Sequence, residues 1–300
     1  MNEIGHKIKD KIVEIYRSDN FKIAFLPYKR EMWDSMESVY EECVKAGIKT
    51  YICPLPYLRR YGSQRADVLD KDGFEGATDI TVLPELKTDF VVIHYPYDGY
   101  NKVTSMIPQY YTAELKKFGQ VIYIPYSCTN MRQLRLQPGI ANVDYAFLGS
   151  EGEAEAFIQE WEQMGVDFRG KVFGFGSPKM DAIRKISTGN ATIILNSLAP
   201  FLSEPYIRIE KYIDIMLREV AKGRKVIFRP HPLLRQTIKS MRPDTESEYT
   251  KLLIMAEAMG VEIDETSNLE ATLGRADYLI SDPSSVLEMW ANAGKEYEVI

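Results

Sequence analysis

The sequence predicts an α/β protein of two domains, each built around a parallel β-sheet. The chain has 300 residues, 45% of them hydrophobic and 27% charged, and so exceeds the size at which a single hydrophobic core usually stops growing. Short apolar segments alternate with amphipathic helical stretches, which is the rhythm of βαβ units. A polar segment at residues 184–190 separates two such series.

The first series predicts one parallel sheet with crossover helices. Its expected strands are residues 23–26, 50–52, 90–94, 121–124 and 145–148. Helical patterns cover residues 33–45 and 151–164, and the second of them ends at Gly165. Between Pro54 and Pro84 the sequence becomes polar over a stretch longer than a usual strand-to-helix connection. Loops of this kind often carry substrate contacts.

The second series predicts a second Rossmann-like domain. Its expected strands are residues 192–195, 225–228, 261–263 and 278–280, and its expected helices are residues 206–220 and 249–259. We expect the boundary near Ile186, which gives domains of residues 1–186 and 187–300. The sequence ends inside a further strand pattern at residues 298–300, so one alternative is that the second domain is truncated.

Composition excludes several classes of protein. The formal net charge of -6 gives no whole-chain attraction to nucleic acid or to anionic lipid. Cys43, Cys53 and Cys128 are too scattered for a redox or zinc motif, and no cluster of Asp, Glu and His has metal-ligand spacing. The dinucleotide motif GxGxxG is absent after the first strand. We therefore expect no metal, no cofactor and no nucleic-acid partner.

The protein is expected to be soluble and cytoplasmic. Residues 1–20 lack the apolar core of a signal peptide, and no apolar run reaches membrane-spanning length. Isoleucines recur at helical spacing from Ile4 to Ile15 beside several lysines, so one alternative is a helix resting on a membrane surface. Ordinary packing within the domain is the favoured interpretation, and any membrane association is expected to be peripheral.

Arg229 and His231 directly follow the expected strand at residues 225–228. Ligands bind at the carboxyl edge of a parallel sheet, and a guanidinium offers a planar fork for phosphate oxygens. Prolines on both sides of His231 restrict the backbone that aims its ring. The pair is therefore a candidate diphosphate site. The alternative is that Arg229 pairs with a surface carboxylate and that His231 is an ordinary loop residue.

Residues 281–288 contain a strand end, a hydroxyl-rich turn and a helix start. A helix N-terminus carries about half a positive charge, so Ser284 and Ser285 could cradle a diphosphate, with Asp282 in the same turn. The alternative is local capping, because Ser285 and Glu288 have the S-x-x-E spacing of a capping box, which needs no ligand.

A third segment runs from an apolar strand through Gly176 and Ser177 into the expected start of a helix, with Pro178 near its first turn. Lys179 in this turn could neutralise a phosphate. A tight connector with a solvated lysine is the alternative.

Taken in order, these segments resemble the motifs of the CDP-glycerol glycerophosphotransferases, which build teichoic-acid-type polymers of the cell wall. Gly176 to Asp181 resembles G-x-P-[RK]-x-D, Arg229 to Pro232 resembles R-x-H-P, and Ser281 to Ser285 resembles S-D-x-S-S. The resemblance covers about residues 140–295 of the chain.

The resemblance implies GT-B architecture, with two Rossmann-like domains whose parallel sheets face a central cleft. It implies a nucleotide-binding transferase that moves glycerol-phosphate, or a related alditol-phosphate, from a CDP-linked donor to a hydroxyl of a polyol-phosphate, glycan or lipid-linked acceptor. The donor-binding residues it implies are Gly176, Ser177, Lys179, Arg229, His231, Asp282, Ser284, Ser285 and Glu288. His231 is also a candidate catalytic residue.

The first half of the chain departs from the family, because the Trp-His-Gly motif that carries a proposed base is absent. His94 ends the strand at residues 90–93 and is the only histidine of this half outside the terminal helix, so it is the remaining candidate base. A core or loop histidine is the alternative. The departure keeps two other hypotheses open, a nucleotide-sugar glycosyltransferase or epimerase on the same fold and a nucleotide-binding module without catalysis.

We expect the acceptor to bind the first domain, at residues 54–63 and 94–101. Both segments follow apolar strands and so should emerge at the carboxyl edge of the sheet. Tyrosines in them would supply apolar faces with hydroxyl tips, and they are Tyr57, Tyr61, Tyr95, Tyr97 and Tyr100. Arg59 and Arg60 suit an acceptor that already carries phosphate. Asp98 is a further candidate acceptor-binding residue. Packing of the loops by these tyrosines is the alternative.

Overall fold

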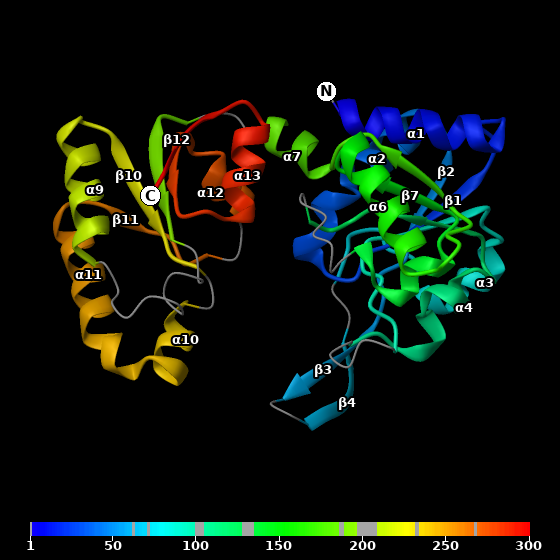
Figure 1. Cartoon of the computed structure of the whole chain (residues 1–300), viewed down its shortest axis with the longest axis horizontal. Coiled ribbons are helices and arrows are strands. Elements are labelled where there is room, and N and C mark those ends of the chain that lie inside the picture. Colours follow the sequence, from blue (N-terminus) through cyan, green and yellow to red (C-terminus); the bar gives the residue numbers. More distant parts are fainter. Residues whose placement is uncertain are drawn as a thin grey trace. The chain divides into compact units, whose positions relative to one another are not determined.

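The computed structural model describes residues 2–61, 64–70, 73–99, 105–127, 135–185, 189–196, 209–231, 234–266 and 269–300 (Figure 1). The chain forms two compact units, Met1–Ala182 (unit 1) and Ile183–Ile300 (unit 2). The boundary predicted from the sequence, Ile186, lies outside the described residues.

Unit 1 is built around a six-stranded sheet with the order β2-β1-β5-β6-β7-β8, and its pairings are parallel. The strands are β1 (Lys22–Leu26), β2 (Lys49–Ile52), β5 (Phe90–Ile93), β6 (Gln120–Tyr123), β7 (Tyr145–Leu148) and β8 (Lys171–Gly174). The strands predicted in the first series are all present. The chain order reverses between β1 and β5, and open α/β sheets bind ligands at the carboxyl edge beside such a reversal.

The first helix of unit 1 packs into the unit along its apolar face. The helices that begin in unit 1 are α1 (Glu3–Tyr16), α2 (Glu37–Lys45), α3 (Leu83–Leu86), α4 (Thr112–Leu115), α6 (Glu151–Gln163) and α7 (Lys179–Lys185), and the 3-10 turns are η1 (Arg30–Ser35), η2 (Ile80–Val82), η3 (Pro108–Tyr110) and η4 (Pro138–Asn142). The last of these helices, α7, continues across the boundary between the units. Ile4, Ile8 and Ile12 are buried. α1 approaches α2 closely at Gly5, where an added Cβ would lie 2.5 Å from the carbonyl carbon of Ser38. The packing interpretation of the isoleucine pattern is therefore the one the structure supports.

The polar segment after β2 contains an antiparallel hairpin that periodicity did not predict. β3 (Tyr57–Tyr61) pairs with β4 (Gln64–Asp70), and Figure 1 shows both strands projecting from the rest of unit 1. The Leu58 N–H donates to the Ser105 carbonyl at 2.8 Å, which ties the base of the hairpin to the chain after β5. Neither strand alternates apolar with polar residues, so the usual signal of a strand is missing.

Unit 2 has a five-stranded parallel sheet with the order β11-β10-β9-β12-β13. The strands are β9 (Ala191–Leu195), β10 (Lys225–Arg229), β11 (Glu262–Ile263), β12 (Ala276–Ser281) and β13 (Glu296–Val299). The helices are α9 (Ile209–Ala221), α10 (Leu234–Met241), α11 (Glu246–Ala258), α12 (Leu269–Leu273) and α13 (Ser285–Asn292), with a 3-10 turn η5 (Pro243–Thr245).

Helices cover both faces of the unit 2 sheet. Ile227 and Phe228 are adjacent in β10 but belong to different apolar clusters, because successive side chains of a strand point to opposite faces. Phe228 belongs to the cluster that includes Leu252 of α11, and Ile227 belongs to the cluster that includes Trp290 of α13. This confirms the predicted fold class, since both units are α/β domains with parallel sheets. In the described part of the chain, no helix is long and apolar enough to cross a membrane.

Candidate functional site

Three segments with polar side chains lie at the carboxyl edge of the unit 2 sheet. Asn196 follows β9, His231 lies just beyond β10, and the turn at residues 282–284 follows β12. β9 lies between β10 and β12, and its last residue, Leu195, is in register with the last residue of each neighbour. Asn196 is therefore placed between the other two segments.

Arg229 is 4% exposed and is held inside the domain. Its Nη1 lies 2.9 Å from Asp264 Oδ2 and donates to Thr272 Oγ1 at 2.9 Å, and its Nη2 donates to the Thr266 carbonyl at 2.7 Å. Burial alone would raise the pKa of Asp264, but hydrogen bonds from Thr272 and Thr266 and the charge of Arg229 lower that pKa to about 2. Pairing with a carboxylate explains Arg229 without a ligand, so its direct contact with a diphosphate stays a prediction.

Asn196 joins the candidate site, although the sequence motifs did not single it out. It is 4% exposed, and its Oδ1 accepts from the His231 backbone N–H at 3.1 Å. Its Nδ2 has no hydrogen-bond partner among the residues that the structure describes. Burial lowers the pKa of His231, so its ring is mostly neutral at pH 7. The signal that could have found Asn196 is its place directly after the central strand of the second sheet.

Ser284 caps α13, and the predicted capping box of Ser285 and Glu288 is wrong by one residue. Ser284 has extended backbone angles, and its Oγ accepts from the Leu287 N–H at 3.1 Å. Ser285 is the first helical residue, where backbone N–H groups lack an intrahelical partner. Glu288 is exposed in the first turn. The side chain of Ser285 lies outside the described parts.

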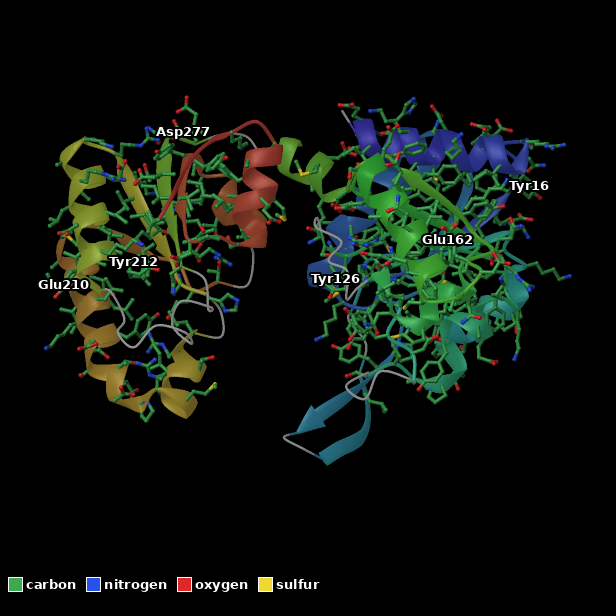
Figure 2. All side chains as sticks on the ribbon, viewed as in Figure 1. Tyr16, Tyr126, Glu162, Glu210, Tyr212 and Asp277 are labelled. Atoms are coloured by element: carbon green, nitrogen blue, oxygen red, sulfur yellow. The ribbon has the colours of Figure 1, made fainter. Side chains whose placement is uncertain are left out.

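Asp282 anchors the same turn to α9. Its side chain is 4% exposed, and its Oδ2 accepts from Tyr212 OH at 2.7 Å. Figure 2 shows Tyr212 between α9 and the strands, where its ring centroid lies 5.9 Å from that of Phe228. This contact fixes the turn between β12 and α13, so Asp282 supports the helix end through the backbone.

In unit 1, His94 is fully buried at the end of β5. Its Nε2 accepts from the Tyr28 N–H at 2.8 Å, so Nδ1 carries the proton, and Nδ1 lies 3.1 Å from the Met32 carbonyl and 2.9 Å from Ser35 Oγ. Burial and the charge of Lys179 lower the pKa of His94 to about 3. Both nitrogens of a neutral ring are engaged, which favours the core-histidine alternative. A catalytic role for His94 stays a prediction.

The segment from Gly176 to Asp181 holds α1 in place. Asp181 is buried, and its carboxylate accepts from the backbone N–H groups of Ile4 and Gly5 at 3.2 and 2.8 Å, at the N-terminus of α1. Gly176 has a φ of +106°, and an added Cβ would lie 2.9 Å from Ile4 Cδ1. The glycine and the aspartate of this motif therefore have structural roles in unit 1.

Lys179, from the same motif, pairs with Asp34, and Ser177 lies two residues before it in the chain. Lys179 Nζ lies 2.9 Å from Asp34 Oδ2, which compensates the lysine charge within unit 1. Ser177 Oγ and Asp34 Oδ1 are buried and have no hydrogen-bond partner within the described ranges. Contact of Ser177 and Lys179 with a donor phosphate stays a prediction.

The predicted acceptor segments meet in a tyrosine cluster at the carboxyl edge of the unit 1 sheet. Its members are Tyr28, Tyr57, Tyr95, Tyr97 and Tyr126. The rings of Tyr28 and Tyr95 stack with centroids 4.0 Å apart, and Tyr57 lies 5.0 Å from Tyr28. Tyr97 lies 4.5 Å from Tyr95. Sequence reasoning missed Tyr28 and Tyr126, although both show the same signal, an aromatic residue just after an apolar strand.

The structure gives less support to an acceptor role for the other predicted residues. Arg59, Arg60 and Tyr61 lie on β3, but their side chains lie outside the described parts. Tyr100 lies outside the described residues. Asp98 is 5% exposed and accepts from the N–H and Oγ1 of Thr112 at 3.0 and 3.2 Å, at the start of α4. Burial raises the pKa of Asp98 to about 6. Helix capping explains Asp98, and its contact with an acceptor stays a prediction.

The chain is similar in structure to several solved enzymes. The UDP-GlcNAc 2-epimerase from Methanocaldococcus jannaschii matches with a TM-score of 0.55 and 14% identity, over 92% of this chain and 82% of that chain. The UDP-GlcNAc 2-epimerase from Neisseria meningitidis matches with a TM-score of 0.51 and 15% identity, over 93% and 82%. The Wall Teichoic Acid Polymerase TagF matches with a TM-score of 0.50 and 12% identity, over 99% and 78%.

These likenesses show the fold. It is the GT-B fold, as the motifs implied. No protein-family model and no curated protein matches the sequence.

Proposed function

We propose that the chain transfers a glycerol-phosphate or related alditol-phosphate group from a CDP-linked donor to an acceptor hydroxyl. The order of the three sequence motifs supports the proposal, as does the similarity to the polymerase TagF over 99% of this chain. The observation that carries it is the Asn196 amide, which is buried at the carboxyl edge of the unit 2 sheet with no partner for Nδ2 among the described residues.

The polar groups at this edge suit a diphosphate. Diphosphate oxygens only accept hydrogen bonds, so a site for them needs donors. Asn196 Nδ2, the ring N–H of neutral His231 and the first backbone N–H groups of α13 are donors that follow three adjacent strands. The positive end of the α13 dipole adds to their effect.

Arg229 has a structural role in the proposed donor site. Its ion pair with Asp264 fixes the last residue of β10, and His231 follows two residues later. The pair therefore helps to hold the backbone that leads to His231. This role differs from a direct phosphate contact, because it predicts that loss of Arg229 harms folding as well as donor binding.

The chemistry is a substitution at phosphorus. An acceptor hydroxyl oxygen attacks the β-phosphorus of the donor and forms a new P–O bond, while the bond from that phosphorus to the bridging oxygen breaks. CMP leaves with the electron pair of the broken bond, and the hydroxyl proton passes to a base or to solvent. Catalysis of this kind rests on positioning and on neutralising charge at the phosphates.

A second candidate is an epimerase or glycosyltransferase that uses a UDP-linked sugar. The TM-score of 0.55 to the Methanocaldococcus jannaschii UDP-GlcNAc 2-epimerase exceeds the 0.50 to the polymerase, which is the observation in its favour. A UDP-sugar has the same diphosphate and would meet the same donors. The nucleobase and the transferred group therefore separate the two candidates.

Calorimetric titration tests the proposal. CDP-glycerol should bind more tightly than UDP-GlcNAc, and Asn196→Asp should weaken CDP-glycerol at least about tenfold, or about 1.4 kcal/mol. This variant keeps the acceptor for the His231 N–H but replaces the amide donor with a negative charge. Asn142→Asp adds the same charge at the end of η4 in unit 1 and should bind like the wild type.

The outcomes separate the candidates. Tighter binding of UDP-GlcNAc supports the second candidate. Unchanged CDP-glycerol affinity in Asn196→Asp removes the assigned site, and binding without turnover supports a nucleotide-binding module that has no catalysis.

A further inference from the structure

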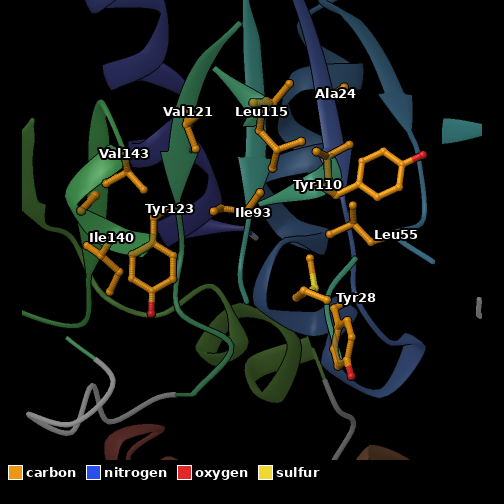
Figure 3. Packing of buried hydrophobic residues seen from close by; sticks show 14 of the residues in the cluster. Ala24, Tyr28, Leu55, Ile93, Tyr110, Leu115, Val121, Tyr123, Ile140 and Val143 are labelled. Carbon is orange, nitrogen blue, oxygen red and sulfur yellow. The ribbon is translucent and has the colours of Figure 1, made fainter. Parts of the chain in front are cut away.

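Hydroxyl groups gather beside the tyrosine cluster in unit 1. Tyr97 OH lies 3.1 Å from Tyr126 OH. Tyr123 ends β6 and is fully buried, and its hydroxyl has no hydrogen-bond partner in the part of the chain that the structure describes. Figure 3 shows the Tyr123 hydroxyl pointing beyond the end of β6, in the same direction as the hydroxyl of Tyr28.

Strand register places Tyr123 beside the cluster. Tyr123 pairs with Ile93 in the β5–β6 register, so it adjoins the segment that carries Tyr95 and Tyr97. Tyr126 follows Tyr123 on the same connection. Burial, and then the nearby Tyr97 and Tyr126, raise the pKa of Tyr123 well above its ordinary value, so its hydroxyl keeps its proton and can donate.

A buried hydroxyl with no partner is unfavourable in the free protein, so a bound molecule that supplies the partner gains from it. Phenol hydroxyls both donate and accept, which suits a ligand whose own groups are hydroxyls. The half-buried rings of Tyr57, Tyr95 and Tyr97 add apolar faces next to those hydroxyls. Sites for small molecules are lined in this way, by aromatic faces with a few convergent polar groups.

We propose that the tyrosine cluster together with Tyr123 binds a polyhydroxylated ligand, a sugar ring or an alditol, through the hydroxyls of Tyr97, Tyr123 and Tyr126. The proposal rests on the proposed function only in naming this ligand the acceptor. It assigns a role to Tyr123 and Tyr126, which no sequence motif singled out. A nucleobase also stacks on aromatic rings, but it does not require the three hydroxyls.

Ligand-observed saturation-transfer NMR tests the proposal, with glycerol, glucose and N-acetylglucosamine as probes and cytidine as the competing class. The variants are Tyr123→Phe and the double variant Tyr97→Phe/Tyr126→Phe, which remove hydroxyls and keep the rings. The control is Tyr16→Phe, which removes a hydroxyl bonded to Asp89 at 2.9 Å. Figure 2 shows Tyr16 and Tyr126 on opposite sides of unit 1.

At least one polyhydroxylated probe should bind the wild type and Tyr16→Phe equally. Both test variants should bind it at least about tenfold more weakly. Tyr123→Phe should be at least as stable as the wild type because it removes a buried hydroxyl that has no partner among the described residues. Weaker binding by this variant therefore cannot come from unfolding.

The proposal is overturned if no polyhydroxylated probe binds or if both test variants bind the probes like the wild type. It is also overturned if only cytidine binds, with the same affinity in the wild type and in both test variants. Titration of the same samples with CDP-glycerol separates this result from the proposed function. Donor binding without sugar binding contradicts the acceptor site alone. Sugar binding without donor binding supports the tyrosine site and contradicts the proposed function.

Discussion

Arg229 Nη1 lies 2.9 Å from Asp264 Oδ2, and both side chains are 5% exposed. The pair joins the end of β10 to the segment after β11, at the edge of the sheet where Asn196 and His231 also lie. An arginine that the sequence places at a ligand-binding edge is thus used to build that edge. The ion pair holds the end of β10, and the candidate donor site includes His231, which follows two residues later.

Replacement of Arg229 should destabilise the protein. Arg229→Met leaves the Asp264 carboxylate buried without its ion-pair partner, and we expect urea unfolding to show a loss of roughly 3 to 5 kcal/mol. Arg235→Met breaks an exposed pair with Glu265 and should cost less than about 1 kcal/mol. Arg229→Met/Asp264→Asn should recover part of the loss. A stability of Arg229→Met equal to that of the control contradicts the structural role.

His94 should make stability depend on acid. Its folded pKa of about 3 lies below its ordinary value of 6.5, so its contribution is fully present above pH 6.5 and is lost as the pH falls toward 3. The difference in unfolding free energy between the wild type and His94→Gln should shrink by roughly 3 kcal/mol between about pH 7 and pH 4. A difference that stays constant over this range would show that His94 is not held neutral in the folded protein.

Asp98 should act in the opposite direction. Its folded pKa of about 6 lies above its ordinary value of 3.8, so its contribution is present below pH 3.8 and is lost as the pH rises through 6. Relative to Asp98→Asn, the wild type should lose roughly 2 to 3 kcal/mol between about pH 4 and pH 7. Comparison of each variant with the wild type by chemical unfolding separates the two groups. A wild type that gains stability over Asp98→Asn as the pH rises is the contradicting result.

Gly176 should matter for folding because its φ of +106° is a conformation that residues with a Cβ rarely adopt. Gly176→Ala should lower the free energy of unfolding by roughly 1 to 3 kcal/mol. Gly152→Ala is the matched control, since in α6 the nearest atom to its new Cβ is Ser150 Oγ at 4.0 Å, and it should gain up to about 1 kcal/mol. Equal melting temperatures for the two variants would show that the backbone at Gly176 can relax.

The fold was largely predictable from the sequence, because each buried strand is a short apolar run. Residues 90–93 and 225–228 are examples, with buried side chains along almost their whole length. The hairpin at residues 57–70 was missed, since pairing between two polar strands leaves no periodic signal. The cap of α13 was placed one residue late, because Ser284 and Ser285 both suit a cap and only the backbone angles distinguish them.

The candidate site was predictable only in position. Strand ends gave Arg229, His231 and the tyrosines after β5, since every parallel strand delivers its next residues to one edge. The partner of Arg229 is Asp264, which is distant in the sequence and becomes a neighbour only when β11 pairs with β10. The partners of the two His94 nitrogens, Tyr28 for Nε2 and Met32 of η1 for Nδ1, are likewise distant in the sequence and become neighbours only in the fold.

The phosphorus atoms of CDP-glycerol report the proposed transfer reaction. Phosphorus-31 NMR of the protein with CDP-glycerol, and with glycerol or glycerol 3-phosphate as acceptor, should show CMP appearing together with a new phosphate ester, at a rate that depends on the acceptor. Asn196→Asp should slow this reaction at least about tenfold, and Asn142→Asp should not change it. If CDP-glycerol instead stays intact while UDP-GlcNAc is converted to its epimer at C2, the transferase assignment is contradicted.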